Sequence, residues 1–408
     1  MNQADTAWML ISTALVLLMT PALAFFYGGL VRSKNALNTM MMSFISLGFV
    51  GVLWAMIGYS LALSPGGSDW LGDLRFAFLN EVTLAETGAV VPLTIPHALY
   101  MAFQATFCII TAALISGAIV ERMRFSAYLL FISLWSILVY APMAHWVWGG
   151  GWLADMGAWD FAGGTVVHVN AGAAAFVAAL VVGKRSDYGH ASILPHNIPT
   201  VLLGAGLLWF GWFGFNAGSA LAASPIAGLA FVTTMLAPAG TLAVWTFLDM
   251  MRSGKPTAVG AATAIVVGLV AITPAAGFVS PMSALALGAI AAVPSYLALI
   301  IRAKTSLDDS LDVVAAHGVG GTVGAILTGV FAEKSVNGVF DGLIAGNPGQ
   351  VGIQALAVAT AIVFSGVTSF ILLKLIGLFI PLRATQSEEA TGLDVTMHGE
   401  EAYLHVTE

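Results

Sequence analysis

The chain has 408 residues, of which 59% are hydrophobic and only 9% are charged, and its mean hydropathy is +0.91. No soluble domain of this length can bury so much apolar surface, and the apolar runs are too long for the alternating strands of a membrane barrel. The net charge of −7 comes largely from the C-terminal end, and the single cysteine, Cys108, excludes an intrachain disulfide and a thiolate metal cluster. The composition therefore predicts an all-α polytopic membrane protein.

The apolar runs predict eleven transmembrane helices. Two long runs must be divided, one at the turn A-G-S-A-L-A-A-S-P, which ends in Pro225, and one at T-P-A-A-G-F-V-S-P, residues 273–281. The first run is interpreted as a retained span, because it carries Asp5 and lacks the basic start of a signal peptide; a cleaved signal peptide is the alternative. The expected spans are 6–31, 36–62, 97–120, 126–147, 163–183, 198–219, 226–249, 257–276, 282–301, 313–332 and 350–373.

Lys and Arg are distributed unevenly between the loops. Twelve of the 14 fall in alternate loops or after the last span, whereas only Arg75 and Lys334 lie in the opposite loops. Because basic loops stay on the cytoplasmic side, this predicts an outside N-terminus and a cytoplasmic C-terminus. The twelve are Arg32, Lys34, Arg122, Arg124, Lys184, Arg185, Arg252, Lys255, Arg302, Lys304, Lys374 and Arg383.

One span carries an ionisable side chain at membrane depth. The stretch D-F-A-G-G-T-V-V-H-V-N-A-G-A-A-A-F-V-A-A-L-V-V-G-K-R has 23 uncharged residues between Asp160 and Lys184, and His168 lies among them. Such a group is costly in the bilayer and marks a functional site by default, although a satisfied core histidine is the plainer interpretation. Asp160 stands where a helix N-cap would stand, which favours a structural role with some electrostatic help to a cation.

The two halves of the chain show a weak internal symmetry. Phe26-Tyr27-Gly28-Gly29 in span 1 is echoed by Phe215-Asn216-Ala217-Gly218 in span 6, and His168 in span 5 is matched by His317 in span 10. Because each half holds five crossings, spans 1–5 and 6–10 must be inverted relative to each other. Inverted repeats are typical of transporters, whose site lies at the interface between them.

The motifs together resemble the Amt/Mep/Rh family of ammonium transporters. The similar segments are the 160–185 stretch above, A-F-F-Y-G-G-L-V-R (24–32), A-H-W-V-W-G-G-G-W (144–152), W-F-G-F-N-A-G-S (212–219) and A-A-H-G-V-G-G (315–321). The tail segment 392–403 resembles the part of bacterial Amt proteins that meets PII signalling proteins. The resemblance implies eleven helices, a homotrimer with one pore per subunit, ammonium as substrate with methylammonium as its analogue, and no cofactor, nucleic acid or enzymatic activity.

The resemblance also assigns roles to residues of this sequence. An outer recruitment site would consist of Trp148, Phe107, Phe215 and Ser219, with Phe107 and Phe215 also stacked as a gate. Asp160 would lie beneath it, His168 and His317 would line a hydrophobic pore as a pair, and Trp212 would line its inner half. Residues 1–383 would form the transporter domain and 384–408 a cytoplasmic regulatory tail, placing the protein in the inner membrane of a bacterium with a role in nitrogen metabolism.

These residue types suit a small cation. Aromatic faces attract cations and a serine hydroxyl accepts one N–H bond, so such a site strips hydration without binding too tightly. Potassium would be attracted as well, but only ammonium can lose a proton and pass a dry, apolar channel as a neutral molecule. Without the resemblance, Phe107 and Phe215 would be interpreted as packing residues and Trp148 as part of an interfacial aromatic belt. His97, His145, His190 and His196 lie near span ends and are expected to be structural.

Other functions remain open from the residues alone. A haem protein with axial histidines, an enzyme using Asp160 and His168, and an ammonium sensor that signals through PII proteins with little flux are the alternatives. Spacing by itself also leaves His168 and His317 far apart, about 5 and 4 residues into spans that start at opposite surfaces. They meet only if 160–164 and 307–312 both dip into the protein. The acidic tail after Arg383 is expected to be mostly disordered, apart from the sequence character of 392–403.

Overall fold

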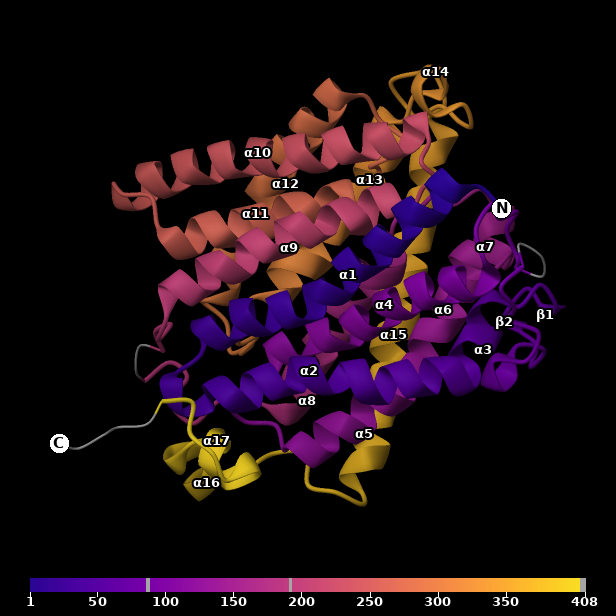
Figure 1. Cartoon of the computed structure of the whole chain (residues 1–408). Coiled ribbons are helices and arrows are strands. Elements are labelled where there is room, and N and C mark those ends of the chain that lie inside the picture. The colour runs from indigo at the N-terminus through magenta and orange to yellow at the C-terminus, as the bar shows by residue number, and fades with distance from the viewer. Residues whose placement is uncertain (86–88, 191–192, 404–408) are drawn as a thin grey trace.

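The computed structural model describes residues 1–85, 89–190 and 193–403, and these form one bundle of long helices (Figure 1). Within this part of the chain, ten helical segments are long and apolar enough to cross a membrane, and the shorter apolar helix α11 (Ala258–Ile272) makes an eleventh crossing. The eleven predicted spans are therefore all present.

The first five crossings form one half of the bundle. Three of them contain wide π-type turns: η2 (Trp54–Gly58) between α2 and α3, η5 (Ser136–Tyr140) between α5 and α6, and η6 at the start of the fifth crossing. The crossings are α1 (Gln3–Leu30), α2 to α3 (Ala36–Leu53 and Tyr59–Leu63), α4 (His97–Ile115), α5 to α6 (Phe125–Trp135 and Ala141–Trp148), and η6 with α8 (Gly164–Val169 and Asn170–Val182). A short hairpin of β1 (Gly67–Ser68) and β2 (Leu71–Gly72), η3 (Ala77–Leu79) and helix α7 (Trp152–Asp155) occupy the connecting loops, and η1 (Ser33–Asn35) and η4 (Ser116–Ala118) are single turns.

The second half repeats this arrangement and adds a final helix. The crossings are α9 (Ile198–Gly218), α10 (Pro225–Ser253), α11, α12 (Pro281–Arg302), and η7 with α13 (Val314–Val319 and Gly320–Phe331); α14 (Lys334–Asn337) is a short loop helix and α15 (Gly349–Gly377) is the last crossing. Both predicted breaks are confirmed. Ser224 and Ser280 cap α10 and α12 through hydrogen bonds to the backbone N–H groups of Ala227 and Ser283, each followed by proline at the first helical position.

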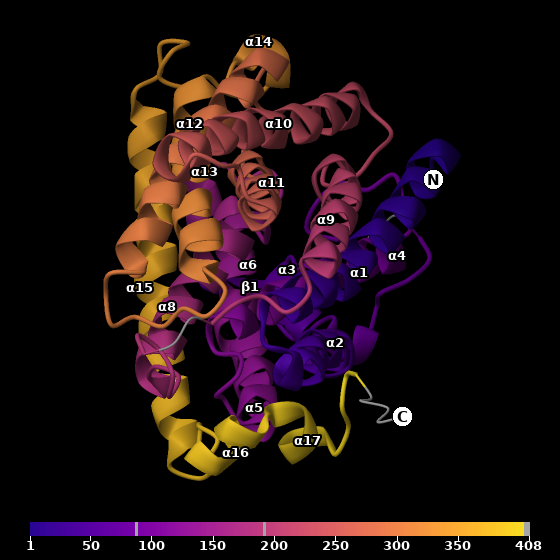
Figure 2. The same cartoon turned by 90° about the vertical axis from the view of Figure 1, so that its left-hand side faces the viewer.

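Small residues hold the two halves together. The most extensive packing is between α1 and α9, where a Cβ added to Gly204 would lie 2.4 Å from the backbone N of Phe26 and one added to Gly211 would lie 2.3 Å from Met19 Cγ. In a membrane, where apolar burial gives little driving force between helices, this close backbone approach supplies the packing contact. Helix α15 crosses behind the other helices at a steep angle (Figures 1 and 2) and packs on α8 and α13.

The C-terminal tail is ordered through residue 403, so the prediction of a mostly disordered tail is wrong for the residues that the structure describes. It forms α16 (Gln386–Thr391) and α17 (Leu393–His398), which lie across one end of the bundle (Figure 2). We call this end the tail end, and the opposite end the vestibule end. The tail is held because Lys34 Nζ donates to the carbonyls of Glu389 and Ala390, and because Asp394 accepts from the backbone N–H groups of Leu37 and Asn38 at 3.0 and 2.7 Å.

Candidate functional site

A cavity of about 630 Å³ opens at the vestibule end, and we call it the vestibule cavity. Its lining includes Trp148, Phe107, Ser219, Asp160 and Gln104. The Trp148 ring meets Phe107 edge-on at 6.1 Å, and its indole N–H donates to the backbone oxygen of Asp160 at 2.8 Å. The Ser219 hydroxyl donates to the carbonyl of Phe215 at 2.8 Å, which leaves its oxygen lone pairs available to an N–H donor. The cavity thus offers aromatic faces and a polar acceptor together.

A pair of stacked phenyl rings forms the floor of the vestibule cavity. Phe107 from α4 and Phe215 from α9 have ring centroids 4.2 Å apart and planes inclined by 31°. Both side chains are buried; Phe107 lines the vestibule cavity, and Phe215 lines the small space below it. The ring pair therefore lies between the two spaces.

Beneath the phenyl pair lies a small enclosed space, which we call the histidine chamber. His168 and His317 line it, their Nδ1 atoms 3.2 Å apart. Trp212 stacks on the His168 ring at 5.4 Å and donates its indole N–H to Thr273 Oγ1 at 2.9 Å. The remaining walls are apolar side chains, and the cavity volume of about 10 Å³ leaves room for about one molecule the size of water.

In the imidazole pair, the hydrogen-bonding role of one ring fixes the role of the other. When both rings are neutral, one Nδ1 donates to the other, so one ring presents Nε2 as an acceptor and the other presents Nε2–H as a donor. His168 Nε2 is buried and has no hydrogen-bond partner among the described residues. The chamber therefore supplies an unused polar atom within apolar walls, which suits a small neutral molecule that both donates and accepts.

Two irregular helix starts bring the histidines together. His168 lies in η6, whose wide turn includes a bond from the His168 N–H to the carbonyl of Gly163 at 3.0 Å, and His317 lies in the equivalent turn η7. The segments 156–163 and 303–313 are both largely non-helical and lead into these turns. Gly172 and Gly318 then pass so closely that a Cβ on Gly172 would lie 2.4 Å from Gly318 Cα. Segments 160–164 and 307–312 therefore both enter the protein, which sequence spacing alone could not establish.

Asp160 caps the start of the fifth crossing with its side chain, although the residue at the N-cap position itself is Gly163. Its buried carboxylate accepts four backbone N–H groups, from Gly163, Gly164, Thr165 and Val166, at 2.6–3.0 Å. These are the donors that a helix start leaves unpaired. The predicted structural role is in agreement with this geometry, and Asp160 is also among the residues that line the vestibule cavity.

Each predicted site residue lines either the vestibule cavity or the histidine chamber. Three of the other histidines have backbone or side-chain partners instead, as expected for structural residues: His97 with Tyr59, His145 with the carbonyls of Ala62 and Ser68, and His196 with the carbonyl of Val31. Sequence reasoning missed Gln104 on the cavity wall and Thr273 as the partner of Trp212. No signal in the sequence separates these from other polar residues on apolar helices.

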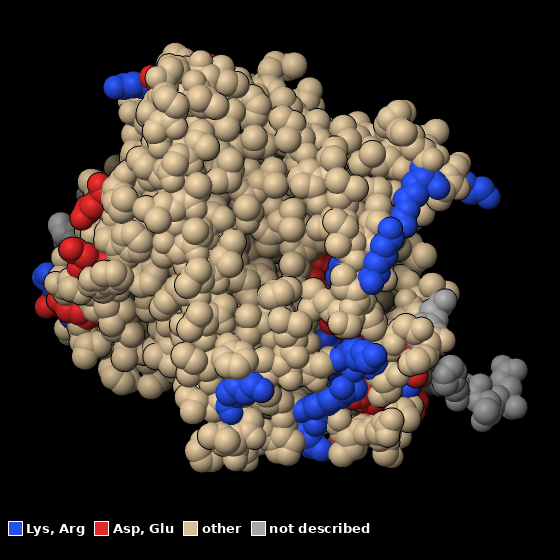
Figure 3. Space-filling view, turned by 180° about the vertical axis from the view of Figure 1, so that it is seen from behind, with Lys and Arg blue, Asp and Glu red and all other residues tan. Residues whose placement is uncertain are grey.

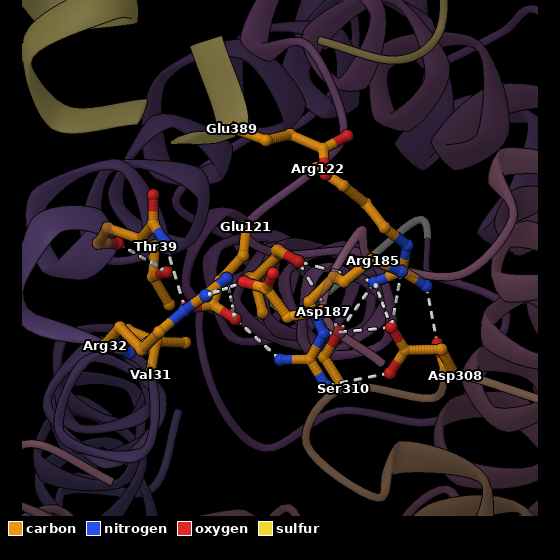
Figure 4. Close-up of polar contacts among 12 residues, drawn as sticks. Val31, Arg32, Thr39, Glu121, Arg122, Arg185, Asp187, Asp308, Ser310 and Glu389 are labelled. Atoms are coloured by element: carbon orange, nitrogen blue, oxygen red, sulfur yellow. Dashed lines mark hydrogen bonds and ion pairs between the residues drawn. The ribbon is translucent and has the colours of Figure 1, made fainter. Parts of the chain in front are cut away.

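Sequence reasoning also missed a buried ion network at the tail end (Figure 4). Arg185 pairs with Glu121 at 2.6 Å and bidentately with Asp308, and Glu121 also binds Arg32 at 2.9 Å. Burial by itself would raise the pKa of Glu121, but Arg185 and Arg32 outweigh it and lower that pKa. Arg122 donates to the carbonyls of Ala118 and Asp308, and burial lowers its pKa to about 10.

Comparison with known proteins adds a family to this geometry. The sequence model of the Ammonium Transporter Family matches residues 7–403. An ammonium transporter of Bacillus subtilis (strain 168) is 49% identical over 405 residues, covering 99% of both chains, and the ammonium transporter Amt1 of Archaeoglobus fulgidus is 44% identical over 99% of this chain and all of the relative. The crystal structure of Saccharomyces cerevisiae Mep2 superposes with a TM-score of 0.91 at 35% identity, covering 100% of this chain and 93% of that one.

A second solved structure carries a different description. A chain described as a sensor Amt protein superposes with a TM-score of 0.89 at 30% identity, covering 97% of this chain and 98% of that one. The matches extend over the whole helical bundle and include the segments that form the vestibule cavity and the histidine chamber. The chain belongs to the ammonium transporter family, a family of membrane transporters and not of enzymes.

Proposed function

We propose that this protein takes up ammonium by drawing the cation into the vestibule cavity and passing neutral ammonia through the histidine chamber. The observation that carries the proposal is the order of the groups along one path: aromatic faces and a serine hydroxyl, then stacked phenyl rings, then an imidazole pair in apolar walls. Methylammonium is the expected substrate analogue.

The vestibule cavity acts on the charged form. The faces of Trp148 and Phe107 attract a cation as water is removed, and the Ser219 oxygen accepts one of its N–H bonds. The buried carboxylate of Asp160 adds a negative potential from below. Each of these contacts is weak, so the ion can leave the cavity again, as a transport site requires.

The histidine chamber acts on the neutral form. Ammonium gives up one proton between the two spaces, because an unpaired ion in the apolar chamber would cost several kcal/mol or more. Ammonia then donates to the accepting Nε2 and accepts from the donating Nε2–H of the imidazole pair. Potassium enters the vestibule cavity by the same attraction but has no proton to lose, so it stops there.

The direction and setting follow from charge. Lys and Arg gather toward the tail end in Figure 3, in keeping with the positive-inside rule. We therefore propose that the tail end is cytoplasmic, that the N-terminus lies outside, and that the protein resides in the inner membrane as a homotrimer with one pore in each subunit. Residues 384–408, of which 404–408 lie outside the described part, form a regulatory segment that a PII-type protein contacts.

The decisive experiment is a current measurement on proteoliposomes together with uptake of labelled methylammonium. Wild type is expected to conduct ammonium or ammonia faster than bare lipid and to reject potassium. A current after a jump in ammonium concentration would show that the proton crosses with ammonia. The variant His168→Ala removes one of the two imidazoles and is expected to reduce flux at least tenfold. Flux of wild type no greater than that of lipid, or equal flux of potassium, contradicts the proposal.

A second candidate is an ammonium sensor that signals through its tail with little flux, which the similarity to a sensor Amt protein favours. Both functions use the same vestibule cavity, so flux per subunit distinguishes them. A sensor gives ammonium-dependent binding of a PII-type protein without methylammonium uptake. For the transporter, deletion of 392–408 is expected to weaken PII binding in a pull-down while basal flux continues.

A further inference from the structure

An apolar groove of about 630 Å³ runs along the outside of the bundle between α8, α15 and the η7–α13 crossing. Its lining side chains are almost all aliphatic or aromatic, including Phe176, Val314, Val363 and Phe370. It extends from the middle of the bundle toward the tail end, because Phe370 lies near the last turns of α15 and Val314 begins η7. The groove has no part in the path described above.

The floor of the groove is the back of the histidine chamber. Gly172 and Gly318, which line the groove, are the two residues at which α8 and η7 meet backbone to backbone. His317 directly precedes Gly318, and His168 lies one helical turn before Gly172. Whatever fills the groove therefore packs against the contact that sets the distance between the two imidazoles.

Water does not suit this groove, because it offers almost no polar partner, and an unfilled groove forfeits dispersion contacts. The groove lies at membrane depth in a chain with eleven crossings, where flexible hydrocarbon chains are the surrounding solvent. Its walls include exposed side chains, such as Val363 at 62% and Val367 at 54%, so it is open to that solvent along its length.

Two lysines follow the groove-lining stretches of α15 and α8 on the side of the tail end. Lys374 lies one turn beyond Phe370, with its ammonium 5.5 Å from the centre of that ring, and it has no carboxylate partner among the described residues. Lys184 is exposed just beyond the C-terminus of α8 and forms no ion pair within the same part of the chain. Figure 3 shows the surrounding face as largely uncharged, with Lys and Arg gathered toward the tail end. An apolar slot that ends at two available cations complements an acyl chain attached to an anionic headgroup.

We propose that this groove is a specific site for an anionic phospholipid of the tail-end leaflet, with one acyl chain along α15 and the headgroup at Lys374 and Lys184. The bound chain supports the Gly172–Gly318 contact and so the spacing of the imidazole pair. The proposal requires only the membrane fold and does not depend on the transport function.

The test is native mass spectrometry of the full-length protein, delipidated in detergent and titrated with dioleoylphosphatidylglycerol or dioleoylphosphatidylcholine. Wild type is expected to bind the first phosphatidylglycerol per chain at least fivefold more tightly than phosphatidylcholine. Gly366→Leu fills the groove and is expected to weaken the first binding event at least tenfold for both lipids. The substitution fits the fold, because a Cβ at Gly366 meets only Val177 Cγ2, at 3.7 Å.

Matched controls separate the groove from general lipid contact. Gly352→Leu lies on the same helix with nothing within 4 Å of its Cβ and is expected to leave both affinities unchanged. The double variant Lys184→Gln/Lys374→Gln is expected to remove the preference for phosphatidylglycerol and keep phosphatidylcholine binding, whereas Lys255→Gln changes neither.

Three outcomes overturn the proposal. Unchanged lipid binding in folded Gly366→Leu excludes the groove, and an unchanged headgroup preference in the lysine double variant excludes the anionic site. A shift of oligomer mass in Gly366→Leu with lipid binding intact assigns this face to a second copy of the chain. If Gly366→Leu does not fold, the lysine variant, whose substitutions are on the surface, decides the question.

Discussion

The segments that precede His168 and His317 both bring non-helical backbone into the bundle, but different partners satisfy and surround them. In each, a buried aspartate precedes the histidine by eight positions, Asp160 before His168 and Asp309 before His317. Asp160 accepts four backbone N–H groups and has no ion-pair partner among the described residues. Asp309 accepts only two, from Val313 and Val314.

The charges around the two caps differ more than the caps themselves. Asp308 next to Asp309 belongs to the buried network with Arg185 and Glu121, and Asp312 pairs with Arg302 at 2.8 Å. Burial raises the pKa of Asp309 above its ordinary value, although its backbone donors and Arg302 oppose the rise. The vestibule-end cap has only backbone partners, whereas the tail-end cap lies beside the ion pairs of Asp308 with Arg185 and of Asp312 with Arg302. The two halves of the repeat thus share a buried aspartate that accepts backbone N–H groups, but they differ in the charges around it.

The largest expected effect comes from removing the vestibule-end cap. Asp160→Ala leaves four N–H groups without an acceptor, each costing about 1–3 kcal/mol, so we expect a loss of more than about 4 kcal/mol and little folded protein. Asp309→Ala leaves two and is expected to cost roughly half as much. Thermal unfolding in detergent measures both variants, with Asp160→Asn as an intermediate that retains one acceptor oxygen. A larger loss in Asp309→Ala than in Asp160→Ala would show that the tail-end cap carries more of the fold.

The next effect concerns the backbone that lets the fifth crossing begin. Gly163 has φ +119°, and a Cβ there would lie 2.5 Å from Val167 Cγ2, so Gly163→Ala combines backbone strain with a clash. We expect it to cost about 1–3 kcal/mol and to reduce methylammonium uptake by moving His168. Gly157→Ala is the matched control, since Gly157 has φ +79° with nothing within 4 Å of its Cβ. Equal losses in the two variants would mean that strain alone, without the clash, sets the effect.

A smaller effect is expected when the tail is released. Asp394 is buried, and Asp394→Ala removes the acceptor for the Leu37 and Asn38 N–H groups. We expect residues 384–403 to be cut at least fivefold faster in limited proteolysis, with the helical bundle intact, because these two hydrogen bonds join only the tail and α2. Glu400→Ala, an exposed acid of the same segment, is the control. Unchanged cleavage in Asp394→Ala would mean that the hydrogen bonds of Lys34 and the ion pair of Arg124 with Glu388 suffice to hold the tail.

The smallest effect is a dependence of stability on pH. Burial opposes ionisation of Glu121 and Asp308, but Arg185 outweighs it and lowers both pKa values. Such groups contribute stability above their unfolded pKa values, about 4.3 for Glu and 3.9 for Asp, and that stability is lost as the pH falls through the lowered folded values. Thermal unfolding between pH 3 and 7 is expected to show the loss below about pH 4. Glu121→Gln is expected to flatten it, and an equally steep loss in that variant would assign the dependence to other acids.

The residues of the site could mostly be predicted from the sequence, but their arrangement in space could not. The resemblance assigned Trp148, Phe107, Phe215, Ser219 and Trp212, and the structure places them around two neighbouring spaces, the vestibule cavity and the histidine chamber. Their roles stay predictions until flux is measured. Gln104 and Thr273 were not predicted, because a polar residue on an apolar helix gives no sign of which side chain it will meet.

The tail shows why a local pattern can mislead. Its excess of acids predicts disorder when it is considered alone, yet Arg124 pairs with Glu388 at 3.0 Å, and Arg383 pairs with Glu389. Lys34 adds hydrogen bonds to two tail carbonyls. Two of these three cations, Lys34 and Arg124, come from loops hundreds of residues earlier in the chain, so composition within the tail could not reveal them.

The sequence by itself determined the eleven crossings, their breaks at Ser224-Pro225 and Ser280-Pro281, and the excess of Lys and Arg in alternate loops. Hydrophobic length, proline and charge act locally, so each can be recognised in a short segment. Only the tertiary structure decided that two histidines from opposite ends lie with their Nδ1 atoms 3.2 Å apart. That contact depends on non-helical backbone entering the bundle from both sides, which is stable only where buried aspartates and neighbouring helices satisfy its N–H groups.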